Sequence, residues 1–262
     1  MCCGNSVKCS YFYNIKNNAN DYSANMSNIN STSIIKSLMA AIPYIGGTIA
    51  SLWSDIQATQ VQRKIERFEQ LITTFEEDID RIKGKINPEY ISRPDSVDVF
   101  EKMTRYVINE RIEKKRVMYK NIYIQSLVSE VCDYDKTEMY MRLVEQMGLI
   151  ELYLLKIFEN PVEFNFKHGN IIKNPFLDEN GNWFSSYMKN YSIMELLPKL
   201  LPQYTIDTIE EGLYLLEQNR LILGKTHHKI FTTNGDPINI FDNILTKKGK
   251  EFVAYLYSES IK

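Results

Sequence analysis

The sequence feature that most constrains the fold is a run of apolar residues spaced alternately four and three positions apart. These residues are Val61, Ile65, Phe68, Ile72, Phe75, Ile79, Ile82 and Ile86. Such heptad spacing places the apolar side chains along one side of an α-helix, which is a pattern that a β-strand cannot produce. At 1.5 Å per residue the helix is about 40 Å long, so other helices are expected to lie along it.

A second long helix is predicted from Asp95 or Ser96 to about Ser129, because Pro88 and Pro94 separate it from the first. It is expected to return antiparallel and to bury the heptad seam within the chain. Two shorter helices are predicted at 136–147 and 149–158. The predicted fold class is therefore mainly α, with a long antiparallel helical hairpin at about 55–129.

The last 71 residues have a different character, and they predict a winged-helix-like α+β domain. Short helices are expected at 192–197 and 206–218, a strand at 221–223 that pairs with 229–233, and a final helix that begins at Thr246. Five regions are predicted in all: a disordered Asn/Ser-rich tail (1–32), an apolar helical hairpin (33–54), the long-helix core domain (55–160), an irregular linker (161–191) and the winged-helix-like domain (192–262).

The most apolar window of the chain, Ile34 to Trp53, is as long as a membrane span, but Pro43, Gly46 and Gly47 interrupt it. Three interpretations remain open. The window forms a helical hairpin buried against the long helices, or it inserts into a bilayer after a trigger, or it spans a membrane permanently. The candidate membrane-interacting residues are Leu38, Ile42, Tyr44, Ile45, Ile49 and Trp53.

A basic run lies in the middle of the second predicted long helix. Runs of this kind usually form a solvated helix face, and the alternative is a contact surface for anionic lipid or for nucleic-acid phosphate. The net charge of −2 and the acidic helix at 206–218, which carries no Lys or Arg, disfavour nucleic acid as the partner. The candidate phosphate or anionic-lipid contacts are Arg111, Lys114, Lys115, Arg116 and Lys120.

No catalytic signature is present in the sequence. It contains no phosphate-binding glycine loop, no HExxH and no CxxC, and the adjacent His227 and His228 cannot share one helix face as metal ligands. Cys2, Cys3, Cys9 and Cys132 have no metal-binding spacing. The chain is therefore expected to have no catalytic residues and to bind no cofactor and no metal.

The segment from Asn109 to Phe158 resembles the abortive-infection alpha proteins of bacteria and their uncharacterised relatives. The similarity lies in Tyr119–Ile122 with Ser126-Leu127, and in the apolar spacing of Leu143, Met147, Leu149, Leu152, Leu155 and Phe158. Members of this family tend to carry an apolar Gly-containing segment upstream and a winged-helix-like tail downstream. The resemblance implies a role in defence against phage and brings no catalytic residues with it.

The sequence and the resemblance together predict a non-enzymatic phage-defence effector of the abortive-infection type. It is expected to be cytoplasmic, and to associate with the membrane on activation through the segment Ile34–Trp53. Two alternatives remain: a transcriptional regulator that uses the winged helix, and an adaptor that forms a homodimer or binds another protein. The heptad seam allows a homodimer because it can be buried between chains as well as within one.

Overall fold

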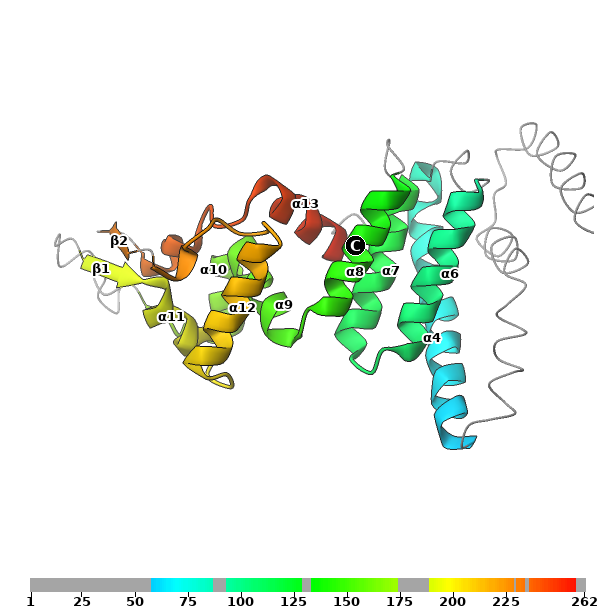
Figure 1. Ribbon diagram of the computed structural model, residues 1–262, viewed down its shortest axis with the longest axis horizontal. Helices are drawn as coiled ribbons and strands as arrows, with labels where there is room; N and C mark the ends of the chain where they lie inside the picture. Colours follow the sequence, from blue (N-terminus) through cyan, green and yellow to red (C-terminus); the bar gives the residue numbers. More distant parts are fainter. Residues whose placement is uncertain are drawn as a thin grey trace, which may run out of the picture. The chain divides into compact units, whose positions relative to one another are not determined.

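A computed structural model of the protein describes residues 58–86, 93–128, 133–173, 189–228, 230–233 and 236–257 (Figure 1). These residues are mainly α-helical, which confirms the predicted class, and they include one two-stranded antiparallel sheet. They form two compact units that meet in the sequence between Met141 and Arg142. The predicted tail (1–32) and apolar hairpin (33–54) lie outside the described residues.

The first unit contains α4 (Ala58–Ile82), which ends in the 3₁₀ turn η2 (Lys83–Lys85), then α6 (Pro94–Asn109), α7 (Glu113–Val128) and the first part of α8 (Tyr134–Gln146). The heptad prediction of a long first helix is confirmed by α4. The prediction of one long helix from residue 95 to 129 is wrong, because the chain leaves the helical conformation between Asn109 and Glu113. Three helices therefore replace the expected two-helix hairpin.

Contacts between aromatic side chains define how these three helices run. Phe75 of α4 contacts Phe100 of α6, and Arg67 lies against Ile108, so α4 and α6 are antiparallel. Phe100 also contacts Tyr123 of α7, while Phe75 contacts Tyr123 directly. The three ring centroids lie 5.4–5.7 Å apart and all three side chains are fully buried. These rings form the centre of the first core.

The break between α6 and α7 has a local cause in Glu110, whose backbone is extended (φ −77°, ψ 130°). Its carboxylate accepts a hydrogen bond from the backbone N–H of Ile112 at 2.9 Å. This side chain thus offers the backbone a partner that competes with the helical one. Neither Gly nor Pro occurs between residues 95 and 129, so no helix-breaking residue marks this position in the sequence.

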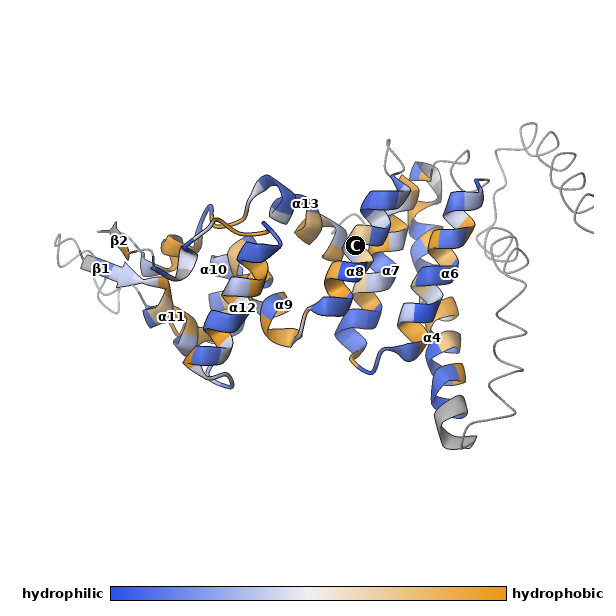
Figure 2. Cartoon of the chain, viewed as in Figure 1, coloured by the Kyte–Doolittle hydropathy of each residue, from blue (hydrophilic) through white to orange (hydrophobic). Residues whose placement is uncertain are grey.

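Burial of the heptad seam changes along α4. Residues in its C-terminal half are fully buried, namely Phe75, Ile79 and Ile82. Residues in its N-terminal half are only half-buried, namely Ile65, Phe68 and Ile72. Figure 2 shows that α4, α6 and α7 each carry both hydrophobic and hydrophilic residues, as expected for helices that bury one side. The described helices therefore leave part of the seam accessible near the start of α4.

The second unit is built around α9 (Leu149–Glu159), which contacts α10, α12 and α13. The Tyr257 hydroxyl fixes the end of α13 to α9 by donating to the Leu152 carbonyl at 3.0 Å. The other elements are α10 (Pro161–Lys167), β1 (Lys189–Ser192), α11 (Ile193–Leu200), α12 (Ile206–Gln218), η3 (Thr226–His228), β2 (Ile230–Thr233), η4 (Pro237–Phe241) and α13 (Lys247–Leu256).

The sheet of the second unit differs from the predicted hairpin. The strand expected at 229–233 is present as β2, but it pairs antiparallel with β1, so that Lys189 lies opposite Thr233 and Ser192 lies opposite Ile230. The segment around Ile222 instead forms a single antiparallel bridge with Leu245. The predicted pairing of 221–223 with 229–233 is therefore wrong, because each partner finds a segment farther away in the sequence.

Two further predictions in this unit need correction. Part of the segment expected to be an irregular linker forms α10, where Asn160 is the N-cap and Pro161 is the first helical residue. The same Asn-Pro pair that ends α9 therefore starts the next helix. The expected interruption at Pro198 is absent, because α11 continues through it to Leu200.

Helix starts in the second unit follow the predicted capping residues. The Ser192 side chain accepts a hydrogen bond from the backbone N–H of Met194, and the Thr246 side chain accepts one from Gly249. Each bond satisfies a backbone N–H that has no partner within its own helix. The predicted beginnings of α11 and α13 are thereby confirmed.

Candidate functional site

Of the five basic residues predicted from the sequence, two are buried in ion pairs and three remain exposed or half-buried. Lys115 is only 6% exposed, and its ammonium group lies 3.3 Å from a Glu110 carboxylate oxygen. Lys120 is buried as well and forms an ion pair with Asp78 of α4. These two lysines neutralise carboxylates inside the first unit and are removed from the candidate contact surface. Arg111 and Lys114 are exposed, and Arg116 is half-buried.

The fold adds two residues that sequence reasoning missed. Arg63 and Arg67 lie one turn apart near the start of α4, and Arg67 interacts electrostatically with Arg63, Arg111 and Arg116. We call these four residues, Arg63, Arg67, Arg111 and Arg116, the arginine cluster. The i, i+4 spacing of Arg63 and Arg67 was the only available signal, and by itself it indicates only a shared helix face.

Hydrogen bonds to the end of α6 hold two members of the arginine cluster in place. Arg67 donates from Nη1 to the Ile108 carbonyl at 3.0 Å. Arg116 donates from Nη1 to the carbonyls of Glu110 at 3.4 Å and of Arg111 at 3.1 Å. The last carbonyls of a helix have no partner within it, so Arg67 satisfies one of them at the end of α6, while Arg116 binds carbonyls in the break that follows. The non-helical residues 110–112 between α6 and α7 therefore position the arginine cluster.

The arginine cluster has no ionic partner of its own in the part of the chain that the structure describes. None of its four members forms an ion pair there, whereas Lys102, Lys115, Lys120 and other cations do. Glu110, the carboxylate whose charge acts on Arg67, already accepts a hydrogen bond from the Ile112 N–H and lies against Lys115. Burial opposes the effect, but these hydrogen bonds and Lys115 lower the pKa of Glu110.

The members of the arginine cluster repel one another, and this repulsion contributes to a lowered pKa of Arg67. Burial, and after it the charges of Arg116, Arg111 and Arg63, lower the pKa of Arg67, and Glu110 only partly opposes them. Arg67 stays protonated at neutral pH because a guanidinium is effectively always charged in proteins. Four like charges held together without counterions are electrostatically unfavourable, and a bound anion would relieve the repulsion.

Accessible apolar side chains lie on the same helices as the arginine cluster. Ile65, Phe68 and Ile72 of α4 are half-buried, as is Ile112 just before α7. Val117 of α7 is 46% exposed. Arginine side chains that flank accessible apolar residues are typical of surfaces that meet the headgroup region of a bilayer. The chemistry that this arrangement allows is binding of an anionic group.

The other candidate residues are placed as follows. Leu38, Ile42, Tyr44, Ile45, Ile49 and Trp53 all lie outside the described residues. Among the helices that the structure describes, none combines the length and the apolar character needed to cross a bilayer. Within those same ranges, no three His, Cys, Asp or Glu side chains are grouped closely enough to hold a metal ion.

Comparisons of the chain with models of known protein families, with curated proteins and with solved structures find no match. The chemistry of the arginine cluster is therefore the basis for proposing a function.

Proposed function

We propose that the chain is a non-enzymatic effector of the abortive-infection type that binds anionic membrane surfaces through the arginine cluster. The observation that carries the proposal is a group of four guanidinium groups that have no carboxylate partner in the described part of the chain. Basic clusters beside an apolar segment are typical of proteins that bind anionic lipids. The resemblance of residues 109–158 to the abortive-infection alpha proteins is the reason for placing this binding in phage defence.

The position of the cluster in the chain supports a membrane over other polyanions. Arg63 follows Trp53, the end of the most apolar window, by only ten residues. Ten residues extend to at most about 35 Å, so the apolar window and the cluster can reach the same bilayer surface. In this proposal Ile34–Trp53 is held against the protein at rest and enters the bilayer on a signal, while the arginine cluster binds the headgroups.

Neutralising two exposed members of the cluster is expected to weaken binding to anionic vesicles. Arg63→Gln with Arg111→Gln removes two charges, each worth about 1 kcal/mol at an anionic surface, so affinity for phosphatidylglycerol-containing vesicles should fall about thirtyfold. The matched control is Lys247→Gln with Lys250→Gln, which removes the same charge from exposed positions on α13. Vesicle co-sedimentation at low salt measures both. Equal binding by the two variants, or no binding by the unmodified chain, would contradict the proposal.

Membrane insertion is tested separately from surface binding. Ile42→Asp with Ile45→Asp should leave vesicle binding through the arginine cluster nearly intact but abolish dye release, because charged residues are costly in the hydrocarbon region. Dye release that persists in this variant would show that the apolar window is not the inserting element. The matched measurement is toxicity on expression in bacteria, which should be lost together with dye release.

We further propose that the second unit is a winged-helix-like module that contacts protein rather than DNA. The order α11, α12, Ile222–Leu245 bridge, α13 supports the fold, and the surface of α12 supports the partner. Its exposed residues include three carboxylates and two large apolar side chains, namely Asp207, Glu210, Glu211, Ile206 and Tyr214. Carboxylates facing a phosphate backbone oppose binding.

Gel retardation at low salt should show no shift of duplex DNA from its own promoter region, and a shift would favour a regulator.

A further inference from the structure

The hydrogen-bonding capacity of the arginine cluster is largely unused. Arg67 and Arg116 each bond to the end of α6 through Nη1 alone, and their Nε and Nη2 groups have no hydrogen bond to any described residue. Arg63 and Arg111 donate no side-chain hydrogen bond in the same ranges. A guanidinium carries five N–H donors in a rigid fork. The guanidinium groups of Arg67 and Arg116 are therefore held in place while most of their donors stay unused by the described residues.

The presence of arginine rather than lysine in the cluster limits the range of possible ligands. Lys115 and Lys120 of α7 are buried in ion pairs, and the cations whose charges act on Arg67 are all arginines. A guanidinium fork matches two oxygens of one phosphate group, whereas a lysine acts as a compact point charge. A surface made for general attraction to negative charge would not need this geometry. The arrangement therefore favours an anion with several oxygens on one phosphorus.

The net charge of the cluster narrows the ligand further. A phosphodiester headgroup carries one negative charge and two non-ester oxygens. A phosphomonoester carries a charge of about −1.5 to −2 near pH 7 and three such oxygens, because its second ionisation lies near pH 6. Four cations with no carboxylate counterion gain more from a dianion than from a monoanion. The monoester also offers one more acceptor oxygen to the forks.

We infer that the arginine cluster selects lipids whose headgroup is a phosphomonoester, with Arg67 and Arg116 as the positioned pair that grips the phosphate. This inference rests on the proposed function, because it names the headgroup that the membrane surface must present. The two exposed arginines, Arg63 and Arg111, add charge at the edge of the site. Binding requires no covalent step.

The test compares two vesicle types of equal surface charge with the full chain. One contains phosphatidic acid, a phosphomonoester, and the other contains phosphatidylglycerol, a phosphodiester, both in phosphatidylcholine. We expect about fivefold or more tighter binding to phosphatidic acid at about pH 7.5, and a smaller preference at about pH 5.5, where the monoester is mostly a monoanion. Because the two vesicle types carry equal surface charge, the ratio of the two affinities does not depend on general electrostatic attraction.

A variant that keeps the charge but removes the guanidinium geometry tests which of the two properties produces the preference. Arg67→Lys with Arg116→Lys should bind both vesicle types but lose the preference between them. If circular dichroism shows that this variant fails to fold, Arg63→Lys with Arg111→Lys should reduce the preference instead, because these exposed side chains donate no hydrogen bond to the described residues. Lys247→Arg with Lys250→Arg is the matched control and should leave the preference unchanged.

The outcomes separate this inference from the proposed function. Equal binding of both vesicle types by the unmodified chain would overturn the phosphomonoester inference and leave membrane binding intact. Absence of binding to either type would overturn both. Displacement from the vesicles by glycerol 3-phosphate at low millimolar concentration would assign the cluster to a soluble phosphomonoester and overturn the lipid form. Displacement by duplex DNA alone would assign it to nucleic acid.

Discussion

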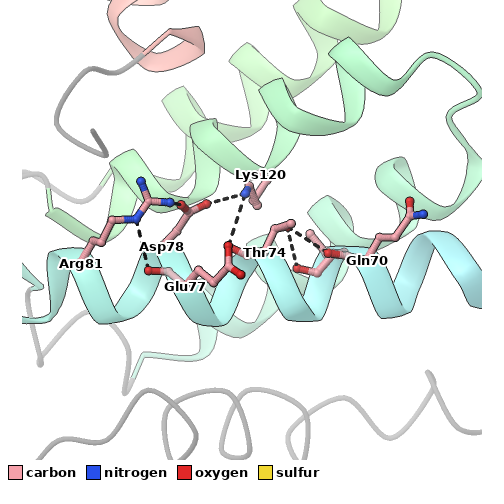
Figure 3. A network of polar contacts seen from close by, with 7 residues as sticks. Gln70, Thr74, Glu77, Asp78, Arg81 and Lys120 are labelled. Carbon is pink, nitrogen blue, oxygen red and sulfur yellow. Dashed lines mark hydrogen bonds and ion pairs between the residues drawn. The ribbon is translucent and has the colours of Figure 1, made fainter.

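Replacing Asp78 by alanine is expected to lower the free energy of unfolding of the first unit by about 3–5 kcal/mol. The Asp78 side chain is 3% exposed and forms ion pairs with Arg81 on its own helix and with Lys120 of α7 (Figure 3). Removing the carboxylate leaves the Lys120 ammonium group buried. Among the described residues, the remaining hydrogen-bond partner of Lys120 is the Thr74 carbonyl, at a long distance of 3.5 Å. An uncompensated buried charge is among the largest single costs that a substitution can cause.

Urea unfolding followed by circular dichroism measures the effect of Asp78→Ala. The matched control is Glu77→Ala, which removes an exposed carboxylate from the neighbouring position of α4 and should change the free energy of unfolding by less than about 0.5 kcal/mol. A double variant, Asp78→Ala with Lys120→Met, removes both charges and should regain most of the lost stability. A loss for Asp78→Ala of under about 1 kcal/mol would show that Lys120 reaches water.

The same ion pair shows why the candidate site was only partly predictable from the sequence. The basic run in α7 was expected to form one solvated face, and charge pattern alone cannot tell an exposed lysine from one that pairs across helices. Asp78 lies 42 positions before Lys120, and only the parallel packing of α4 against α7 brings them together. Of the five basic candidates, Arg111 and Arg116 belong to the arginine cluster, while Lys115 and Lys120 stabilise the interior.

Arg63 and Arg67 of the arginine cluster were not predicted, again because tertiary packing brings them to the other members. Arg67 reaches the Ile108 carbonyl across 41 positions of sequence, so no local window contains both. The break that exposes this carbonyl was itself unpredicted, because Glu110 breaks the helix through its own side chain rather than through Gly or Pro. The site therefore depends on a local feature without a sequence signature and on a tertiary contact.

The parts of the fold that were predicted correctly rest on signals carried by the element itself. The heptad seam predicted α4, and a helix was predicted at 206–218, which are the bounds of α12. Capping residues such as Ser192 and Thr246 act within one helical turn, so they can be read locally. Strand pairing is different, because β1 and β2 are nearly 40 residues apart and the hairpin rule favours the nearest partner.

Gly249→Ala is expected to destabilise the second unit by about 1–3 kcal/mol, the range typical of an overpacked substitution that forces a backbone shift. A Cβ at position 249 would lie 1.9 Å from the Leu221 carbonyl oxygen, a distance that no neighbour can accommodate without moving. Two bonds hold the start of α13 there: Thr246 donates from its backbone N–H to the Leu221 carbonyl at 3.0 Å and from its hydroxyl to the Arg220 carbonyl at 2.6 Å. The segment carrying the Ile222–Leu245 bridge would have to shift with it.

Whether Gly249→Ala lowers or raises the free energy of unfolding shows whether tertiary packing or helix propensity dominates at this position. Alanine is a better helix former than glycine by about 1 kcal/mol, so α13 considered alone would be stabilised by the substitution. Gly224→Ala is the matched control, because it makes the same chemical change at an exposed position with no atom within 4 Å of the new Cβ. It should change the free energy of unfolding by less than about 0.5 kcal/mol. Thermal and urea unfolding of both variants provide the comparison. If Gly249→Ala is as stable as Gly224→Ala, α13 does not pack against Leu221 and the bridge at Ile222 loses its support.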